Sequence, residues 1–418
     1  MQILQNYPVF VARQPIFDRF DSVWAYELLY RSREFPNSAG TIKDPDQATL
    51  EVISHGFSLA LTASSKKKPV FINFPENLIL EKSAFALPSD LCVVEILETV
   101  NPTQDIIDAC LELKSNGYRI ALDDYFGQPG FEEIIRIADF IKVDILKLSP
   151  VEVKNLVKSL SKNNAKILAE KIEHYTIYKL CKKIGFDFFQ GFFFCVPQVI
   201  TGSKPSSAQM SRLKMVKDLC VDNVDLSDLS EVIKKDASLS YRLLNFINSA
   251  FFGFRKEISS IHQAVTLLGI RQTKQWLRVN ILSDMNETPM DSELTFMAAL
   301  RGKFLEIISE TLEQPPFPPE SMFMLGLFSL LDALIGRPMD EILEKLPIEE
   351  KMKNILINPG KSPHGLWLSL VKAQEKGQWD NIIPIINKLQ LDPLETTNAY
   401  NTSVEWVKTS LAPTRKHT

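Results

Sequence analysis

Residues 120–130 read IALDDYFGQPG, a short apolar run that ends on two adjacent aspartates, Asp123 and Asp124. A run of this length is typical of a buried strand. A carboxylate at its end is costly to bury unless it is hydrated, paired or bound to a cation. Taken alone, the pair favours a simpler interpretation, a polar loop that caps a helix. The way in which the other strands end therefore decides the case.

Further apolar runs of the same kind recur through the first 200 residues. With RIALDD (119–124), they are VWAYELLY (23–30), VFINF (70–74), CVVEIL (92–97), FIKVDI (140–145), KILAEKI (166–172) and FDFFQGFFF (186–194). Stretches of helical period lie between them. One follows Asn101, a candidate N-cap, and stops at Gly117. Another stops at Gly185 and carries on one face Ile177, Leu180, Cys181 and Ile184.

Strand, helix and strand at a spacing of about 25 residues indicate parallel βαβ units. Seven or eight units in the first half predict a TIM-like (β/α)₈ barrel, near the lower size limit of that fold. A doubly wound open sheet is the alternative, although the chain has no G-x-G-x-x-G turn. After the barrel the strand signals vanish and only helical spacing remains. We therefore expect a β/α barrel at 1–198, a linker at 199–211 and an all-α domain at 212–418.

Composition narrows the classes of function. With a net charge of −4, the chain has no electrostatic footprint for duplex nucleic acid or an anionic membrane surface. Its five cysteines form no C-x-x-C pair, which is typical of reduced thiols in a cytoplasmic protein. We see no signal peptide and no apolar run long enough to span a membrane.

Nearly every predicted strand carries one oxygen-bearing or cationic side chain in or at the end of its apolar run. These residues are Glu27, Asn73, Glu95, Asp123, Asp124, Lys142, Glu170 and Gln190. The carboxyl ends of barrel strands converge on one face, so these side chains are expected to meet there. Converging carboxylates repel one another unless cations hold them, and hard oxygen ligands suit Mg²⁺ or Mn²⁺.

This equipment suits metal-assisted hydrolysis of a phosphodiester. Two adjacent aspartates allow one carboxylate to bridge two metal ions, and two cations can clamp the attacking and leaving oxygens. Lys142 lies among the predicted ligands, where its ammonium can polarise a water or neutralise developing charge. A barrel without any ligand would leave the carboxylates at the strand ends unexplained.

The order and spacing of these residues resemble EAL domains, the β/α-barrel phosphodiesterases that linearise cyclic di-GMP. YELLYRS (26–32) is similar to the E-A-L-x-R signature, with Leu28 in place of alanine. The other matching segments are FINF (71–74), EILE (95–98), ALDDYFG (121–127), IKVD (141–144), LAEKIE (168–173) and FQGFFF (189–194). The resemblance implies cyclic di-GMP as ligand and two Mg²⁺ or Mn²⁺ ions as cofactors.

The resemblance also implies a role for each matching residue. The implied metal ligands are Glu27, Asn73, Glu95 and Asp123, with Asp124 at the second metal. Lys142 is implied to hold the catalytic water, and Glu170 to act as ligand or general base. Gln190 would support the ligand, and Arg31 would contact a phosphate of the dinucleotide. A homodimer through the barrel is a further expectation of the resemblance.

Several positions depart from the family's pattern. Leu97 replaces a threonine, Lys171 replaces the glycine after Glu170, and Val196 replaces a lysine. The loop DDYFGQPGF (123–131) differs from the D-D-F-G-T-G-Y form that couples metal binding to activity. Two functions therefore remain open. One is a cyclic di-GMP phosphodiesterase, and the other is a weak or inactive EAL domain that acts as a receptor or scaffold.

The helical half resembles an HDOD domain, an HD-related output domain. The segment that begins at Lys234 carries the N-S-A, I-x-S-I and A-x-x-L-L-G features of that family. True HD phosphohydrolases need a His-Asp dyad, and none of His262, His364 and His417 precedes an aspartate. We therefore predict a module that binds an unidentified signalling protein, with His262 packed between helices rather than bound to a metal.

Overall fold

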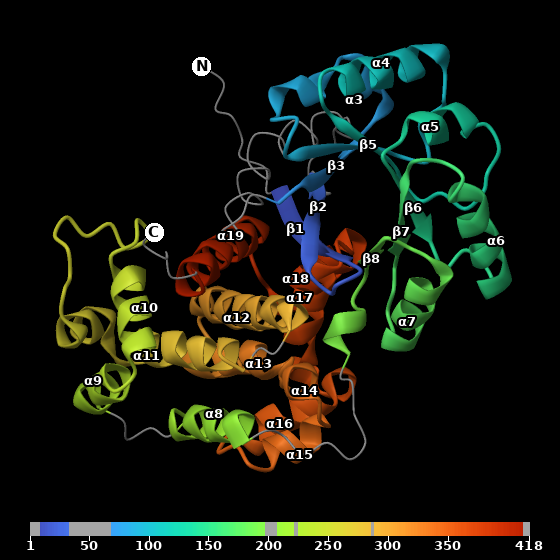
Figure 1. Ribbon diagram of the computed structural model, residues 1–418. Coiled ribbons are helices and arrows are strands. Elements are labelled where there is room, and N and C mark those ends of the chain that lie inside the picture. The colour runs from blue at the N-terminus through green and yellow to red at the C-terminus, as the bar shows by residue number, and fades with distance from the viewer. Residues whose placement is uncertain (1–8, 33–67, 197–206, 221–224, 286–287, 413–418) are drawn as a thin grey trace. The chain divides into compact units, whose positions relative to one another are not determined.

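The computed structural model describes residues 9–32, 68–196, 207–220, 225–285 and 288–412. Contacts between Cα atoms divide the chain into two compact units of different architecture (Figure 1). The first unit comprises Met1–Val196 with Ala373–Asp380, and the second comprises Pro197–Lys372 with Asn381–Thr418. The limits predicted for the domains stay a prediction, although α8 (Ser207–Asp218) begins inside the stretch expected to be a linker.

The first unit is a closed barrel of eight strands. The strands are β1 (Val9–Asp18), β2 (Val23–Ser32), β3 (Val70–Phe74), β4 (Cys92–Ile96), β5 (Arg119–Leu122), β6 (Phe140–Asp144), β7 (Lys166–Glu170) and β8 (Phe188–Gln190). The seven apolar runs found in the sequence are β2 to β8, which pair in parallel in chain order. The prediction of a β/α barrel is confirmed.

The strand that the sequence analysis missed is β1, and it makes the barrel not wholly parallel. It runs antiparallel to both β2 and β8 and closes the barrel between them. A tight hairpin joins β1 to β2. Asp18 Oδ1 accepts hydrogen bonds from the backbone N–H groups of Phe20 and Ser22, and Asp21 adopts a left-handed conformation with φ 63°.

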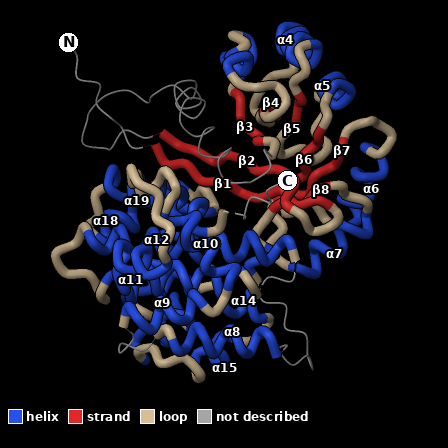
Figure 2. Tube along the Cα trace, turned by 60° about the vertical axis from the view of Figure 1, so that its left-hand side comes forward, coloured by secondary structure: helices blue, strands red, loops and turns tan. Residues whose placement is uncertain are grey.

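Helices cover the outside of the barrel strands (Figure 2). They are α3 (Glu76–Leu80), α4 (Gln104–Ser115), α5 (Glu132–Ile137), α6 (Pro150–Leu160) and α7 (Tyr175–Ile184), with the 3₁₀ turns η2 (Ser83–Ala86) and η3 (Phe193–Cys195).

Two details of these helices correct the sequence analysis. The N-cap of α4 is Thr103 rather than Asn101. Helix α7 ends at Gly185 as predicted, with φ 119°. Its predicted apolar face is confirmed at Cys181, which is buried, but it is wrong at Ile177 and Leu180, which are exposed. The other side chain that the helix buries is Tyr178.

The interior of the barrel is built in layers, because side chains alternate along each strand. An apolar layer comes first. It consists of Ile16, Ala25, Phe71, Val93, Ala121, Phe140 and Leu168, with Trp24 and Phe188 packed against it. On each of β3 to β8 the residue two positions further along the chain is polar. Each strand therefore points one polar side chain inward at its carboxyl end.

The second unit contains only helices among its described residues, which confirms the all-α prediction. They are α8, α9 (Leu226–Lys234), α10 (Ala237–Ile247), α11 (Ile261–Ser283), α12 (Pro289–Glu310), α13 (Pro319–Phe328), α14 (Leu331–Ile335), α15 (Met339–Leu343), α16 (Glu350–Ile357), α17 (Leu366–Glu375), α18 (Trp379–Leu389) and α19 (Pro393–Ser410), with 3₁₀ turns η4 (Pro359–Lys361) and η5 (Pro363–Gly365). Helix α11 breaks at Gly269, whose φ of 76° is one that glycine adopts readily.

Two glycines allow the central helices α12 and α13 to approach closely. A Cβ atom on Gly326 would lie 2.4 Å from the carbonyl group of Arg301, and one on Gly302 would lie 2.8 Å from the carbonyl oxygen of Phe323. No side chain larger than hydrogen fits at this crossing without a shift of backbone. Of the helices in the described part of the chain, none combines the length and the apolar character needed to cross a membrane.

Candidate functional site

Seven predicted site residues lie on or directly after the barrel strands β2 to β8, Glu27 and Lys142 in the middle of their strands and the other five at or just after the carboxyl ends. They are Glu27 on β2, Asn73 on β3, Glu95 on β4, Asp123 directly after β5, Lys142 on β6, Glu170 on β7 and Gln190 on β8. Strand register aligns them, with Asn73 opposite Glu95 across β3 and β4. The structure thus brings these residues together as the sequence analysis expected.

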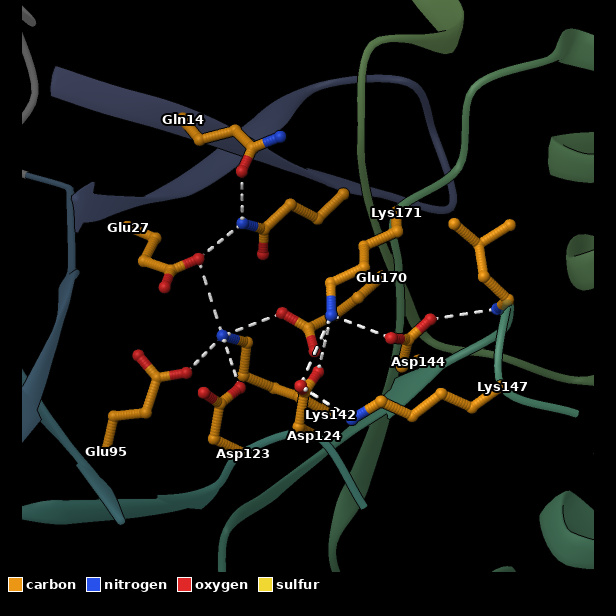
Figure 3. A network of polar contacts seen from close by, with 12 residues as sticks. Gln14, Glu27, Glu95, Asp123, Asp124, Lys142, Asp144, Lys147, Glu170 and Lys171 are labelled. Carbon is orange, nitrogen blue, oxygen red and sulfur yellow. Dashed lines mark hydrogen bonds and ion pairs between the residues drawn. The ribbon is translucent and has the colours of Figure 1, made fainter. Parts of the chain in front are cut away.

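The ammonium group of Lys142 lies at the centre of four carboxylates (Figure 3). Its Nζ atom is 2.8 Å from Glu170 Oε1, 2.9 Å from Asp123 Oδ1 and 3.4 Å from Glu27 Oε2. It also donates a hydrogen bond to Glu95. We call Glu27, Glu95, Asp123 and Glu170 the carboxylate ring. When all are ionised, four negative charges surround one positive charge, so three negative charges remain uncompensated.

Burial makes these charges strongly interdependent. Glu95 and Lys142 are fully buried. Burial raises the pKa of Glu95 well above its usual value, against the attraction of Lys142 and with further increase from the neighbouring carboxylates. Burial raises the pKa of Glu170 in the same way. For Lys142 burial acts to lower the pKa, but the ring outweighs it and holds the pKa well above its usual value. The lysine is therefore protonated at neutral pH.

Two carboxylate oxygens of the ring are available to bind a cation. Glu95 Oε2 and Glu170 Oε2 are buried and have no hydrogen-bond partner among the described residues. An unpaired buried carboxylate oxygen is costly, and a bound divalent cation removes that cost. The donor set is all oxygen, which suits Mg²⁺ or Mn²⁺. The excess negative charge and the orphaned oxygens together fit one divalent cation in the ring.

A second cluster adjoins the ring and is already electrically balanced (Figure 3). We call it the lysine cluster: Asp124, Asp144, Lys147 and Lys171. Lys171 Nζ lies 2.9 Å and 3.2 Å from the two oxygens of Asp124 and 2.7 Å from Asp144 Oδ2. Lys147 Nζ lies 2.9 Å from Asp124 Oδ2. Although partial burial opposes the change, these ammonium groups hold the pKa of Asp124 below its usual value.

Gln190 and Gln14 brace the ring from the side of β1. The amide Nε2 of Gln190 donates to Glu27 Oε2 and, at 2.8 Å, to Gln14 Oε1. Gln14 was missed by the sequence analysis because it lies in the unpredicted strand β1. Arg31 belongs to β2, but its side chain lies outside the described residues.

Two other members of the lysine cluster were also missed in the sequence. Asp144 is buried at the end of β6, two residues after Lys142, and strand alternation was the signal that could have identified it. Lys147 follows in the loop, where no pattern marks it.

A pocket of about 380 Å³ opens over the two clusters. Its lining includes Gln14, Glu27, Asp123, Asp124, Lys142 and Glu170. Carboxylate oxygens of Asp123, Asp124 and Glu170 lie within 4.8 Å of one another, a spacing that a metal ion can bridge. No other group of three or more His, Cys, Asp or Glu side chains has such spacing among the described residues.

No corresponding group occurs in the described part of the helical unit. His262 is exposed on α11, so the prediction that it packs between helices is wrong. The described part of the helical unit therefore contains no candidate metal centre.

Family comparisons agree with this architecture. An EAL domain model matches residues 41–197, and an HDOD domain model matches residues 208–335. The Bacillus subtilis protein YuxH, described as uncharacterized, is 33% identical over 406 residues, which cover 95% of this chain and 98% of that protein. The cyclic di-GMP phosphodiesterase CdgJ of Vibrio cholerae is 30% identical over 379 residues, which cover 90% of this chain and 87% of that protein. The chain belongs to the EAL–HDOD family.

Solved EAL structures resemble part of this EAL–HDOD protein. BlrP1 of Klebsiella pneumoniae, in complex with calcium and cyclic di-GMP, is 22% identical with a TM-score of 0.39, over 46% of this chain and 57% of that chain. A standalone EAL protein of Vibrio cholerae, bound to cyclic di-GMP, is 23% identical with a TM-score of 0.36, over 45% of this chain and 92% of that chain.

Proposed function

We propose that the barrel hydrolyses cyclic di-GMP to the linear dinucleotide with Mg²⁺ or Mn²⁺ bound in the carboxylate ring. The observation that carries this proposal is the ring itself, with uncompensated negative charge and buried carboxylate oxygens that lack partners. The relative CdgJ, a cyclic di-GMP phosphodiesterase, matches this chain over both halves and supports the choice of substrate.

The residues that would hold the cation are Glu27, Asn73, Glu95 and Asp123. A divalent cation bound there polarises a phosphodiester and lowers the pKa of a water molecule. Lys142 would orient that water and offset the negative charge that develops on the phosphate. Glu170, whose pKa is raised by burial, would accept the proton of the water.

Two further residues complete the proposed site. Gln190 would keep Glu27 oriented through their hydrogen bond. Arg31 would bind a phosphate of the dinucleotide, a role that the EAL-like sequence alone supports. In the reaction, the water oxygen would bond to phosphorus as its proton passes to Glu170, one phosphorus–oxygen bond to ribose would break, and the ribose oxygen would take up a proton as the ring of the cyclic dinucleotide opens.

A second function is favoured by the lysine cluster. Asp124, which the sequence analysis assigned to a second metal, is bonded to two ammonium groups. Weak positioning of the reacting groups can cost orders of magnitude in rate. A barrel that binds cyclic di-GMP but turns it over slowly would act as a receptor. In either case we propose that the HDOD half binds a signalling protein.

Product analysis distinguishes these functions. The full chain is incubated with cyclic di-GMP and Mn²⁺ or Mg²⁺, the products are separated by chromatography, and binding is measured by calorimetry. The Glu95→Gln variant removes one charge of the ring at nearly constant shape. Its matched control is Glu98→Gln, because Glu98 is exposed three residues further on.

We expect linear product from the wild type and from Glu98→Gln, and a rate at least ~100-fold lower from Glu95→Gln. Cation-dependent binding without product would instead establish the receptor. If the protein shows no binding of cyclic di-GMP and no linear product, both proposed functions are overturned.

A further inference from the structure

We infer that the side-chain ammonium of Lys171 is a built-in cation at Asp124, so that the barrel takes one divalent cation rather than two. This inference deepens the proposed function, because it concerns the same site. Asp123, Asp124 and Glu170 have the spacing of a cation site. The ammonium of Lys171 already lies against Asp124, within hydrogen-bond distance of both of its carboxylate oxygens.

The contacts of Lys171 are those of a central cation. It bonds to both oxygens of Asp124 and, at 2.7 Å, to Asp144 Oδ2. Asp144 is almost fully buried, and its other oxygen accepts the backbone N–H of Leu146 at 2.8 Å. Lys171 is therefore the group that satisfies both carboxylates of the lysine cluster, as a metal ion does when carboxylates converge.

Charge balance separates the lysine cluster from the carboxylate ring. Asp124 and Asp144 are matched by Lys147 and Lys171, and the closest pairs lie between 2.7 and 2.9 Å. The ring, in contrast, has four carboxylates for the single Lys142. A divalent cation reduces the excess charge of the ring but would create excess positive charge beside Asp124. The two neighbouring sites thus differ in their affinity for divalent cations.

The backbone indicates that lysine at position 171 is kept at a cost. Lys171 has φ 58° and Asp124 has φ 47°, both in the left-handed region. Residues with a side chain rarely adopt this backbone conformation, whereas glycine adopts it readily. A strained residue that persists at a site is grounds for a functional hypothesis. Here the strained turn directs the ammonium of Lys171 to Asp124 and Asp144 (Figure 3).

Lys147 provides a comparison within the same cluster. Its ammonium also bonds to Asp124, but among the described residues it forms no ion pair with Asp144, and it lies 5.5 Å from the ring centroid of Phe126. If Lys171 is the built-in cation, neutralising Lys147 leaves the pairing of both aspartates in place. Lys147 is therefore the matched control for Lys171.

The test counts Mn²⁺ ions bound per full-length chain by calorimetry and by electron paramagnetic resonance. Lys171→Gly suits the left-handed backbone, and Lys171→Gln keeps the length of the side chain without its charge, so that one variant remains if the other fails to fold. We expect each Lys171 variant to bind one Mn²⁺ more than the wild type. We expect Lys147→Gln to bind the same number as the wild type.

Each outcome has a definite meaning. A wild type that binds one Mn²⁺ and Lys171 variants that bind two support the inference. An unchanged number, a wild type that already binds two, or an equal gain in Lys147→Gln overturns it. The proposed function fails separately, if the wild type binds no cation at all.

Discussion

Lys142 is the single residue on which the stability of the ring depends most when no cation is bound. Its ammonium is fully buried and contacts all four carboxylates. Replacement by methionine keeps a similar volume but leaves buried negative charge without a partner. We expect Lys142→Met to destabilise the barrel by about 3–5 kcal/mol in the presence of a chelator. Hydrogen exchange of the barrel strands, followed by mass spectrometry, measures the loss.

The loss of stability in Lys142→Met should depend on pH and on metal ions. A carboxyl whose pKa is higher in the folded than in the unfolded chain disfavours folding above its unfolded pKa, and this penalty shrinks as the pH falls. Lower pH or added Mn²⁺ should therefore restore part of the stability. Lys166→Met is the control, because the Lys166–Asp187 pair is largely exposed and is worth at most about 1 kcal/mol. An equally small effect at Lys142 would contradict this account of the ring.

Individual site residues differed in how far the sequence could predict them. The seven site residues on β2 to β8 were predictable because each lies within or directly after an apolar run, and barrel strands converge at their carboxyl ends. The pairing of Lys171 with Asp124 and Asp144 was not predictable in this way. It depends on a left-handed backbone at Lys171 and on contacts between residues 27 and 47 positions apart.

At the scale of the elements, parallel strands were easier to find than the antiparallel one. β3 to β7 are short and mostly apolar: β3 and β4 are apolar apart from one site residue, whereas β5, β6 and β7 each carry one further polar residue, Arg119, Asp144 and Lys166. Such runs are typical of strands buried on both faces. β1 carries Arg13, Gln14 and Pro15 in its middle, so its apolar pattern is weak. Its place in the sheet comes from pairing with β2 and β8, which no local pattern reveals.

The crossing of α12 and α13 yields a prediction for the helical half. A Cβ atom at Gly326 would lie within 2.5 Å of backbone atoms of Arg301 and Gly302, so the helices must separate to accept alanine. We expect Gly326→Ala to destabilise this unit by about 1–3 kcal/mol or more, as overpacked cores do. Faster hydrogen exchange in α12 and α13 would report the change.

Gly360 is the matched control for this substitution. A Cβ atom there would have no neighbour within 4 Å, and its backbone is not left-handed. Gly360→Ala should therefore leave the exchange of α12 and α13 unchanged. Equal protection of α12 and α13 in Gly326→Ala and in the wild type would show that the close approach is not needed.

The whole molecule combines a barrel in which three carboxylates have the spacing of a cation site with a helical unit whose described part contains no such group. The two-part organisation was predictable, because strand signals stop where helical spacing continues. The assignment of Ala373–Asp380 to the first unit was not predictable, since no helical pattern tells which unit the end of α17, the turn after it and the start of α18 join. Both proposals for the barrel depend on a cation in the carboxylate ring.

Anomalous diffraction from crystals of the full chain grown with Mn²⁺ tests that dependence most directly. We expect an anomalous peak within bonding distance of Glu27, Glu95 and Asp123, and its loss in Glu95→Gln. Crystals with Mn²⁺ present but no peak among these carboxylates would contradict the account.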